Sequence, residues 1–345
     1  MGESLRIGLL GAARITEFAL VAPARAGGHR LVAVAARDRN RAQAFADAHG
    51  VERVVGSYAD LVSDPEVDVV YNPLANGLHG PWNLAALKAG KHVLSEKPSA
   101  SNAEEAAEVR DAASTAGTVF MEGFHYLFHP VTRRLHELLA TGELGELRHV
   151  ETVVAMPPPP KDDVRWSLAL AGGAVMDLGC YALHAQRMLA PWAGGAPEVV
   201  SARGGERPQA PGVDAWLDAE LAFPGGATGT ARCSMVHGAW QATCRLVGTR
   251  GEAVALDFVL PHQDDRVVVR TDSGERTEEL GRTSSYTYQL EAFAARVRGG
   301  QPLPPPDSVG GYPPLTPLDA DDALATMRLI DTAYEKAGFT PRPRS

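Results

Sequence analysis

Apolar and polar residues alternate on two length scales along the first third of the chain. Short apolar runs, which predict β-strands, stand at residues 5–10, 31–36, 67–73, 91–95 and 118–123. The stretches between them have helical periodicity, and several end at a glycine. Strands that are apolar almost throughout are typical of a parallel sheet with helices on both faces. The pattern therefore predicts an α/β fold with a parallel sheet for this part.

Beyond about residue 123 the pattern changes to strand-like segments, several of which alternate apolar and polar residues with a period of two. Glycine- and proline-rich turns separate them, and we expect one or two helices between residues 124 and 190. This predicts a second α/β domain with a large, mostly antiparallel sheet. One face of such a sheet is commonly open, and we expect it to serve self-association.

These changes of pattern predict three parts. The first domain covers residues 1–123, the second covers 124–318, and a C-terminal helix covers 319–345. The proline-rich segments 157–160 and 301–317 predict extended connections. Helical periodicity through residues 323–334 indicates that the last helix packs back on the body of the protein.

Composition narrows the classes of partner. The 345 residues are 45% hydrophobic, and the net charge is −9 with no Lys/Arg-rich block, which argues against nucleic acid and acidic membrane surfaces as partners. Three cysteines without CxxC spacing argue against a disulfide framework. The first residues lack the pattern of a signal peptide, and no apolar run approaches the length of a membrane span. We therefore expect a cytoplasmic protein that acts on a small molecule.

The sequence "GLLGAA", Gly8 to Ala13, ends the first predicted strand and opens the first predicted helix. Glycines in such a turn allow backbone N–H groups and a helix N-terminus to approach a pyrophosphate. Ala13 stands where a third glycine often occurs. The motif alone does not distinguish a dinucleotide site from a plain strand–helix turn.

The second predicted strand ends before "RDRNR", where the adenosine ribose of a dinucleotide is read. An acid there accepts a bond from the 2′-hydroxyl of NAD, whereas an arginine accommodates the 2′-phosphate of NADP. Arg37 and Arg41 favour NADP(H) over NAD(H), while Asp38 leaves NAD(H) open. Both arginines also suit a solvated helix start.

Ligands of an open parallel sheet bind outside the carboxyl ends of its strands. Lys97 follows the strand at 91–95, and Asn76 and His79 follow the strand at 67–73, so all three are expected on the ligand side. A helix from about residue 176 would place Asp177, Tyr181 and His184 on one face. An N-terminal aspartate and a core tyrosine would explain that spacing equally well.

Four segments together resemble the glucose–fructose oxidoreductase / inositol dehydrogenase (Gfo/Idh/MocA) family. They are "GLLGAARI", "PLANGLHGPWNLAALKAGKHVLSEKP", "FHYLFHP" and "GGAVMDLGCYALH", and they look closest to the branch that contains dihydrodiol dehydrogenase and xylose dehydrogenase. The resemblance implies a Rossmann domain followed by an α/β domain with a large open sheet, through which a homodimer or homotetramer forms. It also implies hydride transfer between a nicotinamide and a sugar, cyclitol or related alcohol.

The resemblance implies site residues as well. Lys97 corresponds to the lysine of the family's Glu-Lys-Pro motif, Asp177 begins the second motif, and Tyr181 stands where many members have histidine. The residues expected to bind the cofactor are Gly8, Gly11, Ala12, Ala13, Arg14, Ile15, Arg37, Asp38, Arg41, Leu74, Asn76, His79, Glu96 and Lys97. The sequence departs from the family pattern at Ala75, Gly123, His125, Leu127 and His184, which predicts an altered substrate pocket.

Alcohol oxidation removes a hydride from carbon and a proton from oxygen, so it needs an acid/base group. We expect Tyr181 to be that group, with Lys97 as an electrostatic partner that lowers its pKa and orients the substrate oxygen. Asp177 would bind a second substrate hydroxyl. NADP preference favours ketone reduction as the working direction.

Other polar and aromatic residues allow two interpretations. His184, Trp166, Arg165 and Phe124 are candidates for substrate contact, although packing suits the two aromatic residues and a surface ion pair suits Arg165. His125 and His129 have zinc-compatible spacing without further ligands, so we expect packing or pocket lining and no metal.

Two rival functions remain open at this point. A glycosidase that uses its nicotinamide transiently also occurs on this fold. A non-catalytic nucleotide sensor would often lack the lysine or the tyrosine, and both are present here.

Overall fold

The part of the chain up to Glu122, called the first half below, folds around a five-stranded parallel sheet, and the remainder is called the second half. The computed structural model describes residues 4–299 and 318–344. The strand order is β2 (Arg30–Ala35), β1 (Arg6–Leu10), β3 (Val69–Asn72), β4 (His92–Ser95) and β5 (Phe120–Glu122). All five strands are buried along almost their whole length. This burial is the physical reason for their nearly continuous apolar sequence.

Helices connect these parallel strands. A π-helical turn (Glu17–Val21) and α1 (Ala22–Gly27) follow β1, and α2 (Arg39–His49) and α3 (Tyr58–Ser63) follow β2. The later connections are α4 (His79–Lys88) and α5 (Ala103–Ala116). Local sequence sets several ends, because Asn102 caps α5 through its side chain and Gly50 and Gly117 close α2 and α5 in the left-handed conformation.

The second half contains an eight-stranded sheet. Its order is β13 (Gly274–Glu279), β12 (Arg266–Thr271), β11 (Gly251–Ala255), β10 (Gln241–Gly248), β6 (Leu147–Ala155), β9 (Thr228–Ser234), β8 (Ala210–Ala222) and β7 (Glu198–Arg207). All neighbours are antiparallel except β6 and β9. The two sheets confirm the predicted fold class.

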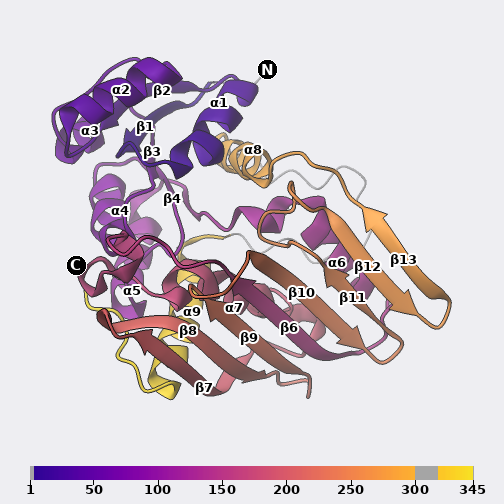
Figure 1. Cartoon of the computed structure of the whole chain (residues 1–345). Coiled ribbons are helices and arrows are strands. Elements are labelled where there is room, and N and C mark those ends of the chain that lie inside the picture. The colour runs from indigo at the N-terminus through magenta and orange to yellow at the C-terminus, as the bar shows by residue number, and fades with distance from the viewer. Residues whose placement is uncertain (1–3, 300–317, 345) are drawn as a thin grey trace.

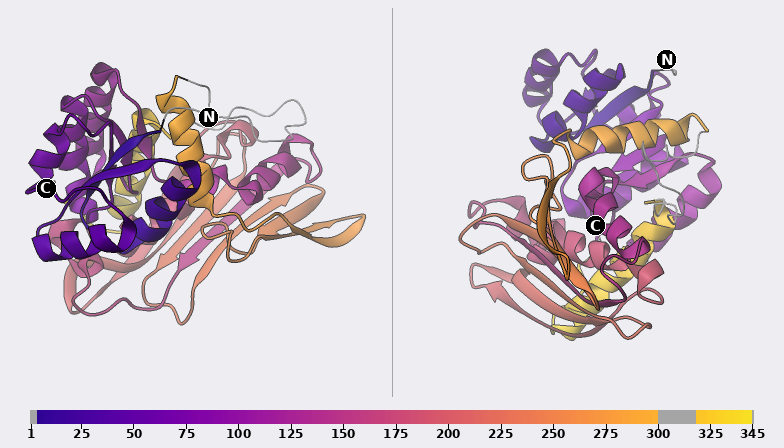
Figure 2. Two further views of the ribbon diagram at one scale, coloured as in Figure 1. Left: turned by 90° about the horizontal axis from the view of Figure 1, so that it is seen from above. Right: turned by 90° about the vertical axis from the view of Figure 1, so that its right-hand side faces the viewer.

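Helices cover one face of the larger sheet (Figures 1 and 2). They are α6 (Pro130–Ala140), which contacts β11, α7 (Cys180–Arg187), which contacts β6 and β9, and α9 (Ala320–Lys336), which contacts β7. Helix α9 also contacts α5 and β5, so it joins the two halves. The division at residues 123 and 318 stays a prediction, and segment 301–317 lies outside the described residues.

Helix α8 (Ser285–Val297) follows the larger sheet in the sequence. It packs against α1 in the first half and against the segment His125–Phe128. This helix is not among the elements predicted from the sequence. In the right-hand view of Figure 2, α8 lies between the two sheets at their upper junction. It therefore brings its N-terminal residues to the boundary between the halves.

The stretch Leu168–Trp192 is long and apolar enough to cross a membrane by composition. This differs from the sequence expectation that no such stretch exists. Its most apolar window is 78% buried inside the protein, as a core helix is. Interior packing therefore accounts for its composition.

The face of the larger sheet that α6, α7 and α9 leave open carries a row of charges. One charged side chain from each strand stands in the row, and the signs alternate from edge to edge. The row is Glu275, Arg270, Glu252, Arg245, Glu151, Arg232, Asp218 and Arg203. Ion pairs link the neighbours except Arg232 and Asp218, which are partners in strand register. We refer to these eight residues as the charge ladder.

A buried ion pair holds the C-terminal end of the chain against β8. The Arg342 guanidinium, 1% exposed, pairs with Asp214, and Tyr334 donates a hydrogen bond to the same carboxylate at 2.9 Å. Burial raises the pKa of Asp214 to about 6, although Arg342 lowers it. The carboxylate therefore depends on these two partners.

We expect Arg342→Met to destabilise the protein by about 3–5 kcal/mol, because it leaves the Asp214 carboxylate buried without its cation. Chemical denaturation at pH 7 measures this. Arg344→Met is the matched control, since Arg344 pairs with Glu104 and Glu108 at the surface and its loss should destabilise the protein far less than the loss of Arg342. Equal losses from the two variants would contradict the prediction.

Candidate active site

Two loops at the carboxyl ends of β3 and β4 are locked together by a buried asparagine. The Asn83 amide donates to Ser95 Oγ at 2.9 Å and to the Ser99 carbonyl at 3.0 Å, and its oxygen accepts from Asn72 at 2.9 Å. His79 reinforces this link, because its ring nitrogens lie 2.6 Å from the Pro98 carbonyl and 2.8 Å from the Leu74 carbonyl. Burial lowers the pKa of His79 to about 4. Asn83 is not among the residues predicted from the sequence.

Lys97 extends from the second of these loops to the other half of the protein. Its Nζ donates to the backbone carbonyl of Asp177 at 2.7 Å and lies 3.5 Å from the Asp177 carboxylate. Burial alone lowers the pKa of this ammonium, but Cys180, Asp177 and Glu96 outweigh burial and raise it above its ordinary value. Lys97 is therefore a protonated cation at the junction of the two halves.

Asp177 lies between two cations. It belongs to the π-helical turn Val175–Gly179 that precedes α7, and its other carboxylate oxygen accepts from Arg165 Nε at 2.6 Å. Burial raises the pKa of Asp177, but Lys97 and Arg165 together bring it below the ordinary value. Arg165 also pairs with Asp163. The ion pair expected for Arg165 thus lies inside the candidate site.

Tyr181 stands one turn beyond Asp177, and Lys97 Nζ lies over its ring, 4.9 Å from the centroid. The hydroxyl lies 3.1 Å from Nε2 of His125. Burial raises the pKa of the phenol well above 10, with further contributions from Tyr286 and nearby carboxylates. The expectation that Lys97 lowers this pKa is therefore wrong for this geometry, because the ammonium faces the ring and burial dominates.

His184 and Phe124, both expected to contact substrate, lie in the interior. His184 has no exposed surface, and its ring nitrogens lie 2.7 Å from Tyr126 Oη and 3.2 Å from Asp322. Phe124 is equally buried and stacks on the His184 ring at 3.9 Å. The sequence spacing placed His184 on the same side as Tyr181 but gave no information about what covers that side. Both residues are therefore buried behind the site and have no exposed surface that a substrate could contact.

Trp166 is the third aromatic candidate. It is 7% exposed, and the Arg207 guanidinium lies 4.8 Å from its ring. Its indole N–H points to the Pro159 carbonyl at 3.4 Å. Trp166, the neighbour of Arg165 in the same short segment, therefore packs against the Pro159 loop and β7.

The glycine turn after β1 is the candidate site for the phosphates of a dinucleotide. Gly11 has a φ of +91°, and a Cβ there would lie 3.1 Å from Leu74. Gly8 has a different role, because a Cβ there would meet Leu61 and Val67 in the core at 2.9 and 3.0 Å. The Thr16 hydroxyl is buried in the first helical turn without a hydrogen-bond partner among the described residues. An open turn beside an unsatisfied hydroxyl fits the phosphates of a dinucleotide, and Ala12, Ala13, Arg14 and Ile15 form its rim.

The residues after β2 surround this turn. The Asp38 carboxylate caps α2 by accepting from the N–H groups of Asn40 at 2.8 Å and Arg41 at 3.2 Å. The Arg41 guanidinium donates to the Ala12 carbonyl at 2.8 Å, and Arg37 is exposed beside it. Oδ1 of Asp38 is therefore engaged by the backbone, while Arg41 contacts the glycine turn and Arg37 is exposed two residues after β2.

Two more cofactor candidates make contacts near Lys97. Glu96 accepts from the Tyr71 hydroxyl at 2.8 Å, and burial raises its pKa. Asn76 donates to the Ala171 carbonyl at 3.2 Å and so joins the loop after β3 to the second half. Among the described residues, no cluster of three or more His, Cys, Asp or Glu side chains could hold a metal ion.

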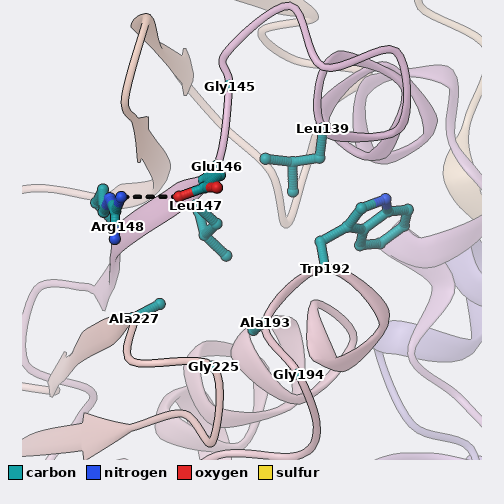
Figure 3. A pocket seen from close by; sticks show the side chains of 10 residues that line it. All are labelled: Leu139, Gly145, Glu146, Leu147, Arg148, Trp192, Ala193, Gly194, Gly225 and Ala227. Carbon is teal, nitrogen blue, oxygen red and sulfur yellow. Dashed lines mark hydrogen bonds and ion pairs between the residues drawn. The ribbon is translucent and has the colours of Figure 1, made fainter.

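Two surface hollows lie away from these residues. A hollow of about 290 Å³ lies at one end of the larger sheet, with Trp192 on one wall and the Glu146–Arg148 ion pair on another (Figure 3). A second, of about 580 Å³, lies at the amino ends of the parallel strands beside Arg6, Arg30 and His92. None of the predicted site residues lines either hollow.

Comparison with known proteins identifies the family. Residues 5–124 match the oxidoreductase family with an NAD-binding Rossmann fold, and residues 132–254 match the GFO/IDH/MocA C-terminal domain. A D-xylose 1-dehydrogenase (NADP(+)) of Haloferax volcanii is 37% identical over 96% of this chain and 97% of its own length. A trans-1,2-dihydrobenzene-1,2-diol dehydrogenase of Bos taurus is 38% identical over 66% of this chain and 67% of its own length.

The structural similarity spans the same range. The 3-ketoreductase KijD10 of Actinomadura kijaniata, solved in complex with NADP and TDP-benzene, has a TM-score of 0.85 and 28% identity, and the match covers 97% of this chain and 98% of that one. These three relatives are named as dehydrogenases or a ketoreductase. The chain is an oxidoreductase of the GFO/IDH/MocA family.

Proposed function

We propose that the protein interconverts an alcohol and a ketone or aldehyde on a sugar, cyclitol or dihydrodiol-like substrate, with NADP(H) as the hydride carrier. One observation carries this proposal: Lys97 from the first half and Asp177 and Tyr181 from the second half converge at the carboxyl end of the parallel sheet. The named relatives that act on xylose and on a dihydrodiol support the substrate class.

The residues divide the chemistry between them. The nicotinamide, when bound, donates or accepts the hydride. Tyr181 is neutral because its pKa is raised, so it donates a proton to the developing alkoxide during reduction. Lys97 has spare N–H donors beyond its bond to Asp177, and its charge stabilises the oxygen on which negative charge develops. Asp177, held ionised by two cations, accepts a bond from a neighbouring substrate hydroxyl.

We expect Tyr181→Phe to lower kcat about 10²–10⁴-fold while the affinity for NADPH stays unchanged, because only the proton donor is lost. Absorbance of NADPH follows the oxidation of D-xylose and trans-1,2-dihydrobenzene-1,2-diol by NADP+, and the reduction of their oxidised products by NADPH. Near-normal turnover by the variant would overturn the assignment of the acid. Hydrolysis of a glycoside with no net change in NADPH absorbance would instead establish the glycosidase.

We further propose that Arg37 and Arg41 bind the 2′-phosphate of NADP(H). The engagement of Asp38 as the cap of α2 supports this, because Oδ1 of its carboxylate already accepts from the N–H groups of Asn40 and Arg41, which leaves one oxygen rather than two for a ribose diol. Arg41 is already held against the glycine turn, and Arg37 stands exposed beside it. A phosphate between them would replace water around two guanidinium groups.

Arg37→Ala should weaken NADPH binding about 10–100-fold, the effect of one charge-assisted hydrogen bond, and leave NADH binding unchanged. Fluorescence titration with each nucleotide measures the two affinities. Arg25→Ala, at the far end of α1, is the control and should change neither. A loss of NADH affinity equal to the loss of NADPH affinity would contradict the proposal.

We also propose that the protein forms a homodimer through the open face of the larger sheet, and that two such dimers could build a tetramer. The charge ladder supports this because it has an even number of members with alternating signs. A two-fold axis at its centre would place every member opposite a charge of the other sign. At that centre Arg245 would face Glu151 of the partner subunit.

The central pair allows a charge-swap test. Arg245→Glu would place like charges opposite each other twice per dimer, so the variant should dissociate at concentrations where the natural protein is dimeric. Arg245→Glu with Glu151→Arg reverses both signs and should restore the dimer. Light scattering after size-exclusion chromatography gives the mass of each variant. A monomeric natural protein, or a dimeric single variant, would refute the ladder as the interface.

A further inference from the structure

The hydroxyl of Tyr181 has a partner that the proposed mechanism does not yet use. His125 has no exposed surface, its Nε2 lies 3.1 Å from Tyr181 Oη, and its Nδ1 lies 2.8 Å from Ser285 Oγ. The three residues come from the segment after β5, from α7 and from the start of α8. A histidine thus joins the candidate acid to a buried hydroxyl.

A second Tyr–His pair crosses between the same two segments. Tyr126, the neighbour of His125, bonds to His184, which lies three residues beyond Tyr181 on α7. His184 continues to Asp322, which pairs with Arg187. The Tyr126–His184 bond joins the two segments directly, and the Asp322 carboxylate of α9 holds the other side of the His184 ring. The packing of the two segments therefore has a polar link that does not involve His125. His125 instead contacts Tyr181, the residue over whose ring Lys97 lies.

The groups around His125 keep it neutral. Burial lowers its pKa well below 6.5, and His262, Lys97 and His129 lower it further. The Tyr286 ring lies 3.8 Å from its ring, and no carboxylate is among the groups that set its charge. A neutral imidazole carries one N–H, and the Ser285 hydroxyl can donate to the nitrogen that lacks a proton.

We propose that His125 is a positioning residue for Tyr181 and carries its proton on Nε2, so that this N–H donates to the Tyr181 oxygen and stabilises the phenolate left after proton donation. The Ser285 hydroxyl donates to Nδ1 in this arrangement. The inference rests on the proposed function, since it assumes that Tyr181 is the acid.

The proton balance is simple. During reduction the hydride reaches the carbonyl carbon, the O–H bond of Tyr181 breaks, and a new O–H bond forms on the substrate oxygen. The negative charge ends on the phenolate, 3.1 Å from the His125 nitrogen. A preorganised donor aimed at developing charge is worth more in a buried site than in water. Alcohol oxidation runs the same steps in reverse, with the phenolate as base.

His125→Leu removes the donor and should raise the pKa that controls alcohol oxidation by about one to two units, because hydrogen bonds to charged groups are worth that much. Since the phenolate is the active form for oxidation, the rate of the variant at pH 8 should fall about 10–100-fold with KM unchanged. His125→Gln keeps an N–H donor and should recover part of the shift. The measurement is kcat against pH with NADP+ and the best alcohol of the panel above.

Tyr126→Phe is the matched control, because it removes the twin hydrogen bond to His184 and should lower stability without moving the pH profile. An unshifted profile in His125→Leu, or an equal shift in Tyr126→Phe, would overturn the proposal. If Tyr181→Phe itself keeps normal turnover, the proposed function fails. If Tyr181→Phe is inactive while His125→Leu has a normal profile, only the role of His125 fails.

A second readout needs neither substrate nor turnover. Labelling the 11 histidines with ¹⁵N and comparing the natural protein with His125→Gln assigns the two ring nitrogens of His125 by NMR. A protonated Nε2 with an unprotonated Nδ1 is the expected tautomer. The opposite tautomer would place the proton toward Ser285 and overturn the proposal, even if the Leu variant does not fold.

Discussion

The buried ammonium of Lys97 is the constraint on which the site depends. A cation that is removed from water needs nearby negative groups, and Asp177 provides two oxygens for it from the other half of the protein. Asp177 is in turn shared with Arg165, which also binds Asp163, so charges alternate across the boundary. Moving the halves apart would leave the Lys97 ammonium without these oxygens, whereas Asp177 would keep Arg165, which lies in the same half. The same network thus holds the two halves in place and keeps Lys97 and Asp177 ionised.

The sequence predicted the parts of this arrangement that follow from local pattern. Apolar runs and helical periodicity indicated the parallel sheet, and because all its carboxyl ends meet at one edge, the placement of Lys97, Asn76 and His79 there followed. Long-range contacts were beyond that reasoning. The bond between His125 and Tyr181 joins residues 56 apart, and the approach of α8, which supplies Ser285, has no periodic signal that names its partner.

The electrostatics of Tyr181 show why proximity alone did not predict the pKa. A lysine beside a tyrosine was expected to stabilise the phenolate, but a cation 4.9 Å from the ring centroid does not contact the oxygen. Removal of the phenol from water favours the neutral form and prevails. A residue that is neutral at rest suits a proton donor, and its conjugate base then needs a donor of its own at the oxygen.

The two Tyr–His pairs show how the same kind of hydrogen bond can have two different roles. His184 of the first pair contacts the Asp322 carboxylate, which also pairs with Arg187. The charge of Asp322 is therefore balanced, and the Tyr126–His184 bond contributes to packing alone. His125 and Tyr181 end at a neutral serine on one side and at the Lys97 cation on the other. Burial opposes negative charge on both phenols. At the Tyr126 pair, however, the Asp322 carboxylate takes the one N–H of the neutral His184, so Nδ1 has no proton to donate to the Tyr126 oxygen. Surroundings, rather than residue types, separate the pair suited to proton transfer from the pair that fastens the fold.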